Sequence, residues 1–177
     1  MMAKIEALIA LANEIIADTS LPLAKSNLVF KLISEIGWKR TEVYITNIVK
    51  RRPSDNRDPL PEEIESYKPY LARQIEIIKP KIIATLGRFS MNYFLPQAKI
   101  TRDEGKLFQF YLPGQTGNYF IYPLFHPAAA LRSATTLEVL RQSFQRLPEV
   151  IAKAEELAKT RPPSSTTEPS VKQESLF

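Results

Sequence analysis

The sequence predicts an α/β domain whose mainly parallel sheet is covered by helices on both faces. Residues 43–49 and 81–86 are short apolar runs rich in β-branched side chains, as buried strands are. Segments with apolar residues at helical spacing lie between and after these runs. Strands that alternate with helices favour a parallel sheet, because a helix returns the chain to the edge from which each strand starts.

The individual elements follow from local patterns. Helices are predicted at 3–16, 28–36, 62–78, 88–94 and 136–158, and strands at 43–49, 81–86, 106–111 and 119–123. The helix at 28–36 ends at Gly37, a residue that adopts left-handed backbone easily. The helix at 62–78 follows Pro61 and starts with acidic residues, which suit the positive end of a helix dipole. Residues 50–61 are basic and rich in turn formers, which predicts a surface loop.

Composition limits the class of protein. The 177 residues suffice for one domain, and 24 Lys plus Arg against 19 Asp plus Glu give a net charge of +5. This charge suits a polyanionic partner, although many basic proteins bind no nucleic acid. The absence of cysteine excludes disulfides, thiolate metal sites and iron–sulfur clusters. No apolar run reaches the ~20 residues of a membrane span, so we expect a cytoplasmic protein without membrane contact. We also expect a monomer.

The C-terminal region differs from the rest in composition. Residues 160–175 are rich in Pro, Ser and Thr and contain little apolar side chain, which predicts disorder. We therefore predict one domain over residues 1–159 and a disordered tail over residues 160–177. The tail ends in Leu176 and Phe177, an apolar pair that serves no folding purpose there.

His126 is the strongest candidate for chemistry. It is the only histidine, and it follows the strand predicted at 119–123. Pro123 and Pro127 flank it, and Arg132 comes shortly after. A histidine in this position can polarise a reacting group or donate a proton to it. A turn histidine without a chemical role explains the same residues equally well.

Asn47 is the second candidate, because it interrupts an apolar segment. Burying an amide costs free energy unless its donors and acceptors are matched. An asparagine can offer one donor and one acceptor to the O4 and N3–H edge of uracil, whereas cytosine presents the opposite pattern. The alternative is that Asn47 holds a neighbouring loop.

Four blocks of sequence together resemble the family 4, iron–sulfur type uracil-DNA glycosylases. The blocks are EVYITNIVKRRPSDNRDPLPEEI, YKPYLARQIEIIKPKIIATLGR, ITRDEGK and FHPAAALR, within residues 41–147. Weaker similarity extends to residues 21–30. The resemblance implies a three-layer α/β/α fold of the uracil-DNA glycosylase type. It also implies hydrolysis of the N-glycosidic bond of uracil in DNA after the nucleotide has flipped out of the stack.

The resemblance assigns roles to matching residues. Asn47 matches the residue that reads the uracil edge, and His126 the residue that hydrogen-bonds O2 and stabilises the departing base. Leu131 matches the minor-groove loop as a wedge, and Arg132 would contact a phosphate or the groove. The predicted phosphate contacts of the basic loop are Lys50, Arg51, Arg52 and Arg57. The alternative for this loop is a solvated run of charge.

The sequence departs from the family in its cluster positions. The residues that stand where the family has cluster cysteines are Asp18, Leu21, Arg51 and Tyr67. None of them can replace a thiolate ligand of iron. We therefore expect neither an iron–sulfur cluster nor another cofactor or metal.

A second departure concerns the water-activating carboxylate. Between Phe30 and Lys31 the family has a first strand, a Gly-Glu-Ala-Pro-Gly motif that orients water, and an aromatic residue that stacks on uracil. This segment is missing here, and Glu35 lies in a helical pattern that is expected to face solvent. Losing a general base costs about 10²–10⁴-fold in rate. An incomplete gene model is the alternative, which the coding sequence would decide.

The last five residues, QESLF, resemble the pentapeptide with which bacterial repair proteins dock on the sliding clamp. Gln173, Leu176 and Phe177 match the motif, whereas Glu174 stands in place of the usual leucine. Two hypotheses result: a uracil-DNA glycosylase of reduced activity, or a non-catalytic DNA-binding module recruited to the clamp. The FHPAAALR block favours the first, and the missing carboxylate motif favours the second.

Overall fold

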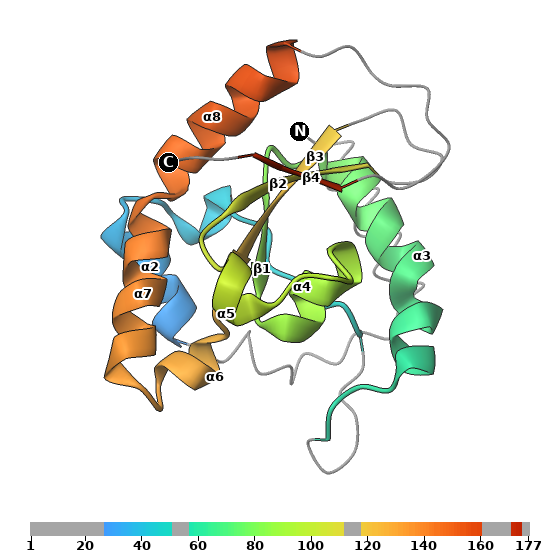
Figure 1. The fold of residues 1–177 in the computed structure, drawn as a ribbon, viewed down its shortest axis with the longest axis horizontal. Coiled ribbons are helices and arrows are strands. Elements are labelled where there is room, and N and C mark those ends of the chain that lie inside the picture. Colours follow the sequence, from blue (N-terminus) through green and yellow to red (C-terminus); the bar gives the residue numbers. More distant parts are fainter. Residues whose placement is uncertain (1–26, 51–56, 112–117, 161–170, 175–177) are drawn as a thin grey trace. The chain divides into compact units, whose positions relative to one another are not determined.

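The structure, a computed structural model, describes residues 27–50, 57–111, 118–160 and 171–174 (Figure 1). The chain divides into two compact units. The first unit comprises Met1–Asn27 and Thr41–Pro80, and the second comprises Leu28–Arg40 and Lys81–Phe177. The helix predicted at 3–16 lies outside the described residues.

Helix α3 (Pro61–Ile78) is the main element of the first unit, and it confirms the helix predicted at 62–78. The Glu63 carboxylate accepts a hydrogen bond from the Leu60 backbone N–H at 2.8 Å, which satisfies one of the amides that a helix start leaves open. The helix ends at Lys79, whose left-handed backbone (φ 50°) lets its N–H donate to the Ile75 carbonyl at 2.7 Å.

The strand predicted at 43–49 is wrong. Residues 43–47 have no regular structure and residues 48–50 form a bend. A strand needs a hydrogen-bonded neighbour, and none of the described strands pairs with this segment. Ile48 and Val49 are nevertheless buried. The segment is therefore apolar because its side chains pack in the core of the first unit, and not because it pairs as a strand.

The second unit contains a mixed sheet of four described strands in the order β1-β3-β2-β4. The strands are β1 (Ile83–Leu86), β2 (Leu107–Tyr111), β3 (Asn118–Leu124) and β4 (Val171–Glu174). The α/β class is confirmed, but a mainly parallel sheet is not what the described residues form. Only β1 and β3 pair in parallel, whereas β2 is antiparallel to β3 and to β4. The short connection between β2 and β3 suits an antiparallel pair.

The tail differs from the predicted disorder over four residues. Val171–Glu174 forms β4, which runs beside β2 with Gln173 opposite Phe108 (Figure 1). An edge strand carries a row of unpaired N–H and C=O groups that another segment can use. Without β4, β2 would carry such a row in the described sheet.

Seven helices and helical turns of the described chain complete the second unit. They are α2 (Asn27–Glu35), η2 (Arg40–Glu42, which extends past the boundary of the unit), α4 (Arg88–Phe94), α5 (Ile100–Asp103), α6 (Pro127–Ala130), α7 (Ala134–Gln145) and α8 (Leu147–Thr160). The end of α2 is as predicted: Gly37 has a φ of 80° and donates to the Ser34 carbonyl at 3.0 Å. No helix in the described part of the chain is long and apolar enough to cross a membrane.

The single helix predicted at 136–158 is wrong, because two helices cover this range. Ser133 begins α7 with a side-chain cap, its Oγ accepting from the Thr136 N–H at 3.2 Å. The chain changes direction at Arg146 (Figure 1). Pro148 then lies in the first turn of α8, where its missing N–H costs no hydrogen bond. Inside one continuous helix the same proline would remove a backbone hydrogen bond.

The core of the second unit lies on the sheet. Fully buried apolar side chains of β2, β3, α4 and α7 contribute to it, among them Leu107, Ile121, Tyr122, Met91 and Leu140. The rings of Phe94 and Phe110 pack edge to face with centroids 5.6 Å apart, which joins α4 to β2.

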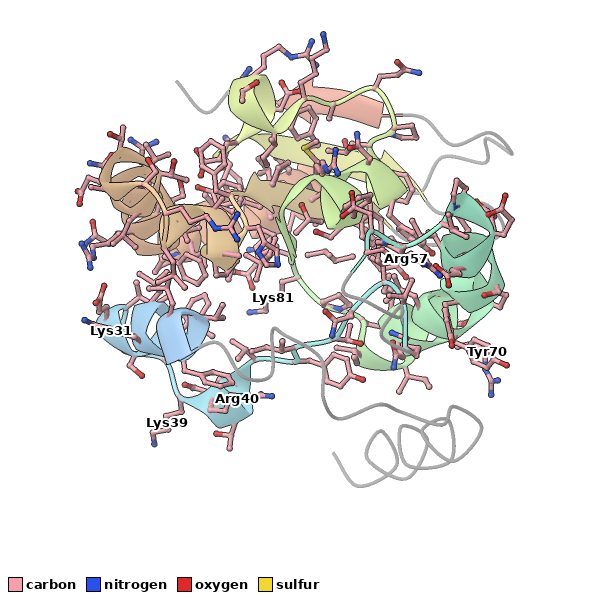
Figure 2. All side chains as sticks on the ribbon, turned by 90° about the horizontal axis from the view of Figure 1, so that it is seen from below. Lys31, Lys39, Arg40, Arg57, Tyr70 and Lys81 are labelled. Carbon is pink, nitrogen blue, oxygen red and sulfur yellow. The ribbon has the colours of Figure 1, made fainter. Side chains whose placement is uncertain are left out.

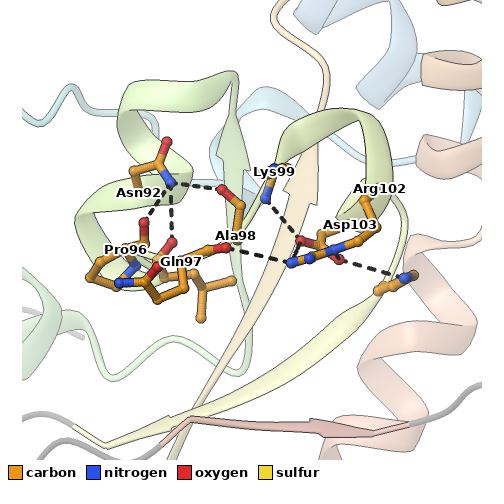
Figure 3. Close-up of polar contacts among 9 residues, drawn as sticks. Asn92, Pro96, Gln97, Ala98, Lys99, Arg102 and Asp103 are labelled. Carbon is orange, nitrogen blue, oxygen red and sulfur yellow. Dashed lines mark hydrogen bonds and ion pairs between the residues drawn. The ribbon is translucent and has the colours of Figure 1, made fainter.

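A polar network holds the loop between α4 and α5 (Figure 3). The Asn92 Nδ2 group donates to the carbonyls of Leu95, Pro96 and Ala98 at 3.2, 3.3 and 2.9 Å. Asp103, whose residue is 1% exposed, accepts two hydrogen bonds from the Arg102 guanidinium at 2.8 and 2.7 Å. These bonds lower the pKa of Asp103 to about 2. The turn that leads into β2 is therefore fixed by one buried carboxylate.

Candidate functional site

The carboxyl ends of β1 and β3 meet at one edge of the sheet. Leu86 lies opposite Leu124 in the parallel pair, so the chain leaves both strands at the same point. The Gly87 N–H donates to the Leu124 carbonyl at 2.8 Å, which extends the ladder into the turn. In α/β sheets, ligands bind beyond the carboxyl ends of parallel strands. His126 lies two residues beyond β3 at this edge.

His126 is half-buried and begins the short helix α6. Its Nδ1 accepts a hydrogen bond from the Ala128 N–H at 3.1 Å. A ring nitrogen that accepts carries no proton, so the proton of the neutral ring resides on Nε2. Burial lowers the pKa of His126 below its ordinary value of 6.5. At neutral pH the side chain is therefore an uncharged donor through Nε2–H.

Gly87 supports the histidine from the neighbouring turn. Its φ is 87°, and a Cβ at this position would lie 2.8 Å from the His126 Cβ. Such a distance is shorter than real Cβ contacts, so a side chain at Gly87 would displace the histidine or the turn. Gly87 was not singled out in the sequence analysis. Its place directly after an apolar strand was the signal that could have marked it as part of the site.

Leu131 and Arg132 follow α6 on the surface of the second unit. The Leu131 side chain is exposed, at 71%, and its backbone N–H donates to the Pro127 carbonyl at 3.0 Å. Arg132 is also exposed. A large apolar side chain so exposed, next to a cation and on a turn held by helix hydrogen bonds, is available to a partner. The predicted wedge and groove contact thus have the exposure that these roles need.

Asn47 belongs to the first unit and is half-buried. Its side chain makes no hydrogen bond with any other described residue, whereas its backbone carbonyl accepts from Lys50 Nζ at 2.7 Å. The amide of Asn47 therefore keeps a donor and an acceptor that a ligand could use.

Lys50 does not have the predicted role of a phosphate contact. Its residue is 5% exposed, and its ammonium donates to Thr46 Oγ1 at 2.9 Å, to the Asn47 carbonyl at 2.7 Å and to Gln74 Oε1 at 2.7 Å. These three bonds use all three donors of an ammonium. Burial lowers the pKa of Lys50 to about 8. The prediction for Lys50 was wrong because a run of basic residues does not show which of them is buried against a helix such as α3.

Arg57 is engaged at the start of α3, beside which Figure 2 shows it. Its two terminal nitrogens donate to the two Glu63 oxygens at 2.8 and 2.7 Å. This pairing is the largest cause that lowers the pKa of Glu63, to about 2. A phosphate would therefore compete with Glu63 for these two donors of Arg57. Arg51 and Arg52 lie outside the described residues, as do Leu176 and Phe177.

The comparison with known families decides where this arrangement belongs. The family model described as "Uracil DNA glycosylase superfamily" matches residues 12–148. The chain belongs to this superfamily. A match of this extent includes parts of both units, together with Asn47, His126 and the turn after α6.

Curated relatives of the superfamily make the placement finer. A "Type-4 uracil-DNA glycosylase" of Sulfurisphaera tokodaii is 40% identical over 133 residues, which are 72% of this chain and 60% of the relative. A protein of the same name from Archaeoglobus fulgidus is 36% identical over 135 residues, 73% of this chain and 67% of the relative. A third protein of this name, from Thermotoga maritima, is 38% identical over 108 residues, which are 60% of this chain and 54% of the relative. These relatives confirm family 4, although the chain spans about three fifths of the length of the first.

The family's iron–sulfur cluster does not fit the residues of this superfamily member. The sequence contains no cysteine. Of the four positions that match cluster ligands, only Tyr67 is described; it lies on α3, with its ring centroid 6.3 Å from that of Tyr70. A phenol side chain beside another aromatic ring provides no thiolate for iron. No group of three acidic or histidine side chains that could hold a metal ion occurs among the described residues.

The water-activating carboxylate of the superfamily has no replacement in Glu35. This side chain, at the end of α2, accepts from Arg141 Nε at 3.2 Å. The ion pair joins α2 to α7 within the second unit and occupies the carboxylate with a structural contact.

Proposed function

We propose that this protein removes uracil from DNA by hydrolysing its N-glycosidic bond. The observation that carries the proposal is the neutral His126, with its Nε2–H available at the carboxyl edge of β1 and β3. When the C1′–N1 bond breaks, the electron pair remains on uracil and its charge spreads to O2. A donated Nε2–H stabilises that charge where it develops, and water adds to C1′ while its proton is released.

Base selection is proposed to come from Asn47. Its side chain has no described partner, so its amide can offer one donor and one acceptor to a flipped base. Uracil matches this pair at O4 and N3–H, whereas cytosine presents the reverse. Leu131 would fill the space left by the flipped nucleotide, and Arg132, Arg51 and Arg52 would contact the backbone.

The proposed activity is slow. The motif that orients water in family 4 has no match in the sequence, and Glu35 is bound to Arg141. Without a general base the rate falls by about 10²–10⁴-fold, whereas stabilisation of the leaving base by His126 does not need a carboxylate.

Excision of uracil from a labelled single-stranded oligonucleotide, at enzyme in excess over substrate, tests the proposal. The His126→Ala variant should lose excision, and Lys153→Ala on the exposed side of α8 should retain it. Equal excision by wild type and His126→Ala would overturn the role of the histidine.

A non-catalytic DNA-binding module is the second candidate, and the Glu35–Arg141 pair favours it because the second unit then has no free carboxylate in α2. This candidate predicts that the wild type binds uracil-containing DNA without cleaving it. Binding without any excision in the experiment above would select it.

We further propose that the tail recruits the protein to the bacterial sliding clamp through Gln173, Leu176 and Phe177. The support is the sequence QESLF alone. Substituting Leu176→Ala and Phe177→Ala together leaves β4 intact and should abolish binding to purified clamp while DNA affinity stays unchanged. Retained clamp binding by this variant would refute the proposal.

A further inference from the structure

The buried ammonium of Lys50 is unusual because its hydrogen-bond partners among the described residues are all uncharged. Its three partners are a hydroxyl, a backbone carbonyl and an amide oxygen, from Thr46, Asn47 and Gln74. No described carboxylate contacts it. A buried cation without a counterion costs stability, and an apolar side chain of similar length would fill the same space. What Lys50 adds over such a side chain is the set of three hydrogen bonds.

These bonds tie one short segment to one helix. Two partners, Thr46 and Asn47, belong to the segment that precedes Lys50, and Gln74 belongs to α3. The Gln74 Nε2 group donates in turn to the Tyr44 hydroxyl at 3.1 Å. A single helix side chain thus contacts both ends of residues 44–50.

Apart from the buried side chains of Ile48 and Val49, few described contacts hold the segment. It forms no ladder, and residues 44–50 make no backbone-to-backbone hydrogen bond with the described part of the chain. Buried backbone groups without such partners depend on side chains for their hydrogen bonds. The Lys50 ammonium supplies one to the carbonyl of Asn47 itself.

We propose that Lys50 is a positioning residue: it holds the Asn47 backbone against α3 so that the Asn47 amide is presented in one orientation to a flipped base. The inference rests on the proposed function, in which Asn47 selects uracil. An amide that reads a base needs its donor and acceptor fixed, because a loosely held group can match uracil and cytosine about equally well.

The first measurement concerns Asn47 alone and needs no DNA. In a ¹H–¹⁵N spectrum of the full chain, the side-chain NH₂ and backbone signals of Asn47 should be single and sharp. Lys50→Met, which keeps the apolar stem, should shift and broaden them. Lys68→Met, an exposed lysine of α3, is the matched control and should leave them unchanged. Unchanged Asn47 signals in Lys50→Met would overturn the proposal.

The second measurement concerns base selection. Binding is compared for two oligonucleotides, one with 2′-fluoro-2′-deoxyuridine and one with 2′-fluoro-2′-deoxycytidine, since the fluorine slows cleavage. Lys50→Met should reduce the preference for uracil by about ten-fold, as expected for one well-placed bidentate contact. The salt dependence of binding should not change. An equal loss for both oligonucleotides with a shallower salt slope would instead show a phosphate contact and overturn the proposal.

Chemical rescue separates positioning from a general loss of folding. The chain has no cysteine, so Lys50→Cys carries a unique thiol. Alkylating the unfolded variant with 2-bromoethylamine displaces bromide and creates a thioether analogue of lysine, and refolding follows. The amine should restore the Asn47 signals and the preference for uracil, whereas alkylation with iodoacetamide, which adds a neutral amide, should not. Equal recovery with both reagents would contradict a role for the ammonium.

The outcomes for Lys50 and for uracil selection can be told apart. If the wild type shows no preference for uracil but Lys50→Met still disturbs the Asn47 signals, the proposed function fails and the positioning role stands. If the wild type prefers uracil and Lys50→Met keeps both the preference and the signals, the positioning role fails and the proposed function stands.

Discussion

At His126, one backbone hydrogen bond decides which ring nitrogen carries the proton. The Ala128 N–H occupies Nδ1, and burial disfavours the charged ring. A pattern of residues can show that a histidine follows a strand, and the prediction of His126 as a candidate rested on that. It cannot show a tautomer, because the tautomer depends on the turn of α6, which no pattern in the sequence predicted.

The protonation of His126 can be measured directly, because it is the only histidine of the chain. Its ¹⁵N and ¹H ring signals should show the Nε2–H tautomer at pH 7.5 and titrate with a midpoint below 6.5. Since burial lowers the folded pKa, the neutral form is favoured on folding, and this group costs stability as pH falls through 6.5. A midpoint above 6.5, or a proton on Nδ1, would contradict the hydrogen bond described.

Gly87→Ala should disturb the same signals. The new Cβ would meet the His126 Cβ at 2.8 Å, in a backbone conformation with positive φ. We expect a loss of about 1–3 kcal/mol in the free energy of unfolding and a shifted histidine titration.

Gly37→Ala is the matched control for this prediction. Gly37 also has a positive φ, 80°, but a Cβ there would meet nothing within 4 Å. It should lose stability through the backbone alone and leave the His126 signals unchanged. Equal effects of the two substitutions on the histidine would refute the close contact.

At the scale of elements, local signals predicted helices well and pairing poorly. Proline, glycine and acidic residues mark the ends of α3 and α2, and these ends are where the sequence put them. The segment at 43–49 has strand composition but lacks a partner, which composition cannot report. Lys50 was misassigned for the same reason, since its burial depends on Gln74, twenty-four residues further along the chain.

The turn between α5 and β2 should control the acid stability of the second unit. The hydrogen bonds from Arg102 are the largest cause that lowers the pKa of Asp103 from 3.8 to about 2. A lowered carboxylate pKa contributes stability that is present above about pH 4 and is lost as pH falls towards 2. Fluorescence of Trp38, the only tryptophan, follows unfolding of this unit.

Asp103→Asn should be less stable at pH 6 and should lose less stability than the wild type between pH 4 and 2. Asn cannot carry the charge that pairs with Arg102, so its contribution does not titrate. A wild type whose stability is flat across this window would contradict the pairing. Glu156→Gln, on the exposed face of α8, provides the control.

At the scale of the whole molecule, the residues proposed for function are divided between two compact units. The first unit contains Asn47 and Lys50, and the second contains His126, Leu131 and Arg132. The match to the superfamily includes parts of both units and all five of these residues. The sequence revealed this family through ordered blocks, because such blocks identify a relative without requiring each element to be assigned correctly.

The arginines proposed to contact phosphates should make the affinity for DNA depend on salt concentration. Each phosphate contact on single-stranded DNA contributes about −0.7 to the slope of log affinity against log salt. Arg51→Ala and Arg132→Ala should each make the slope shallower by about this amount. Lys50→Met should not, because Lys50 is 5% exposed and its ammonium already makes three hydrogen bonds. Titration of binding between low and moderate salt gives these slopes, and a change for Lys50→Met alone would reverse the assignment.

Strand β2 and the proposed clamp would compete for the same residues of β4. Gln173 and Glu174 are paired with β2, yet both belong to the motif proposed for the clamp. A groove that takes these residues as an extended peptide must first draw them out of the sheet. The apparent dissociation constant then equals the intrinsic one divided by the fraction of molecules whose strand has already detached. The pairing with β2 would therefore set a threshold concentration of clamp, below which residues 171–174 remain in the sheet.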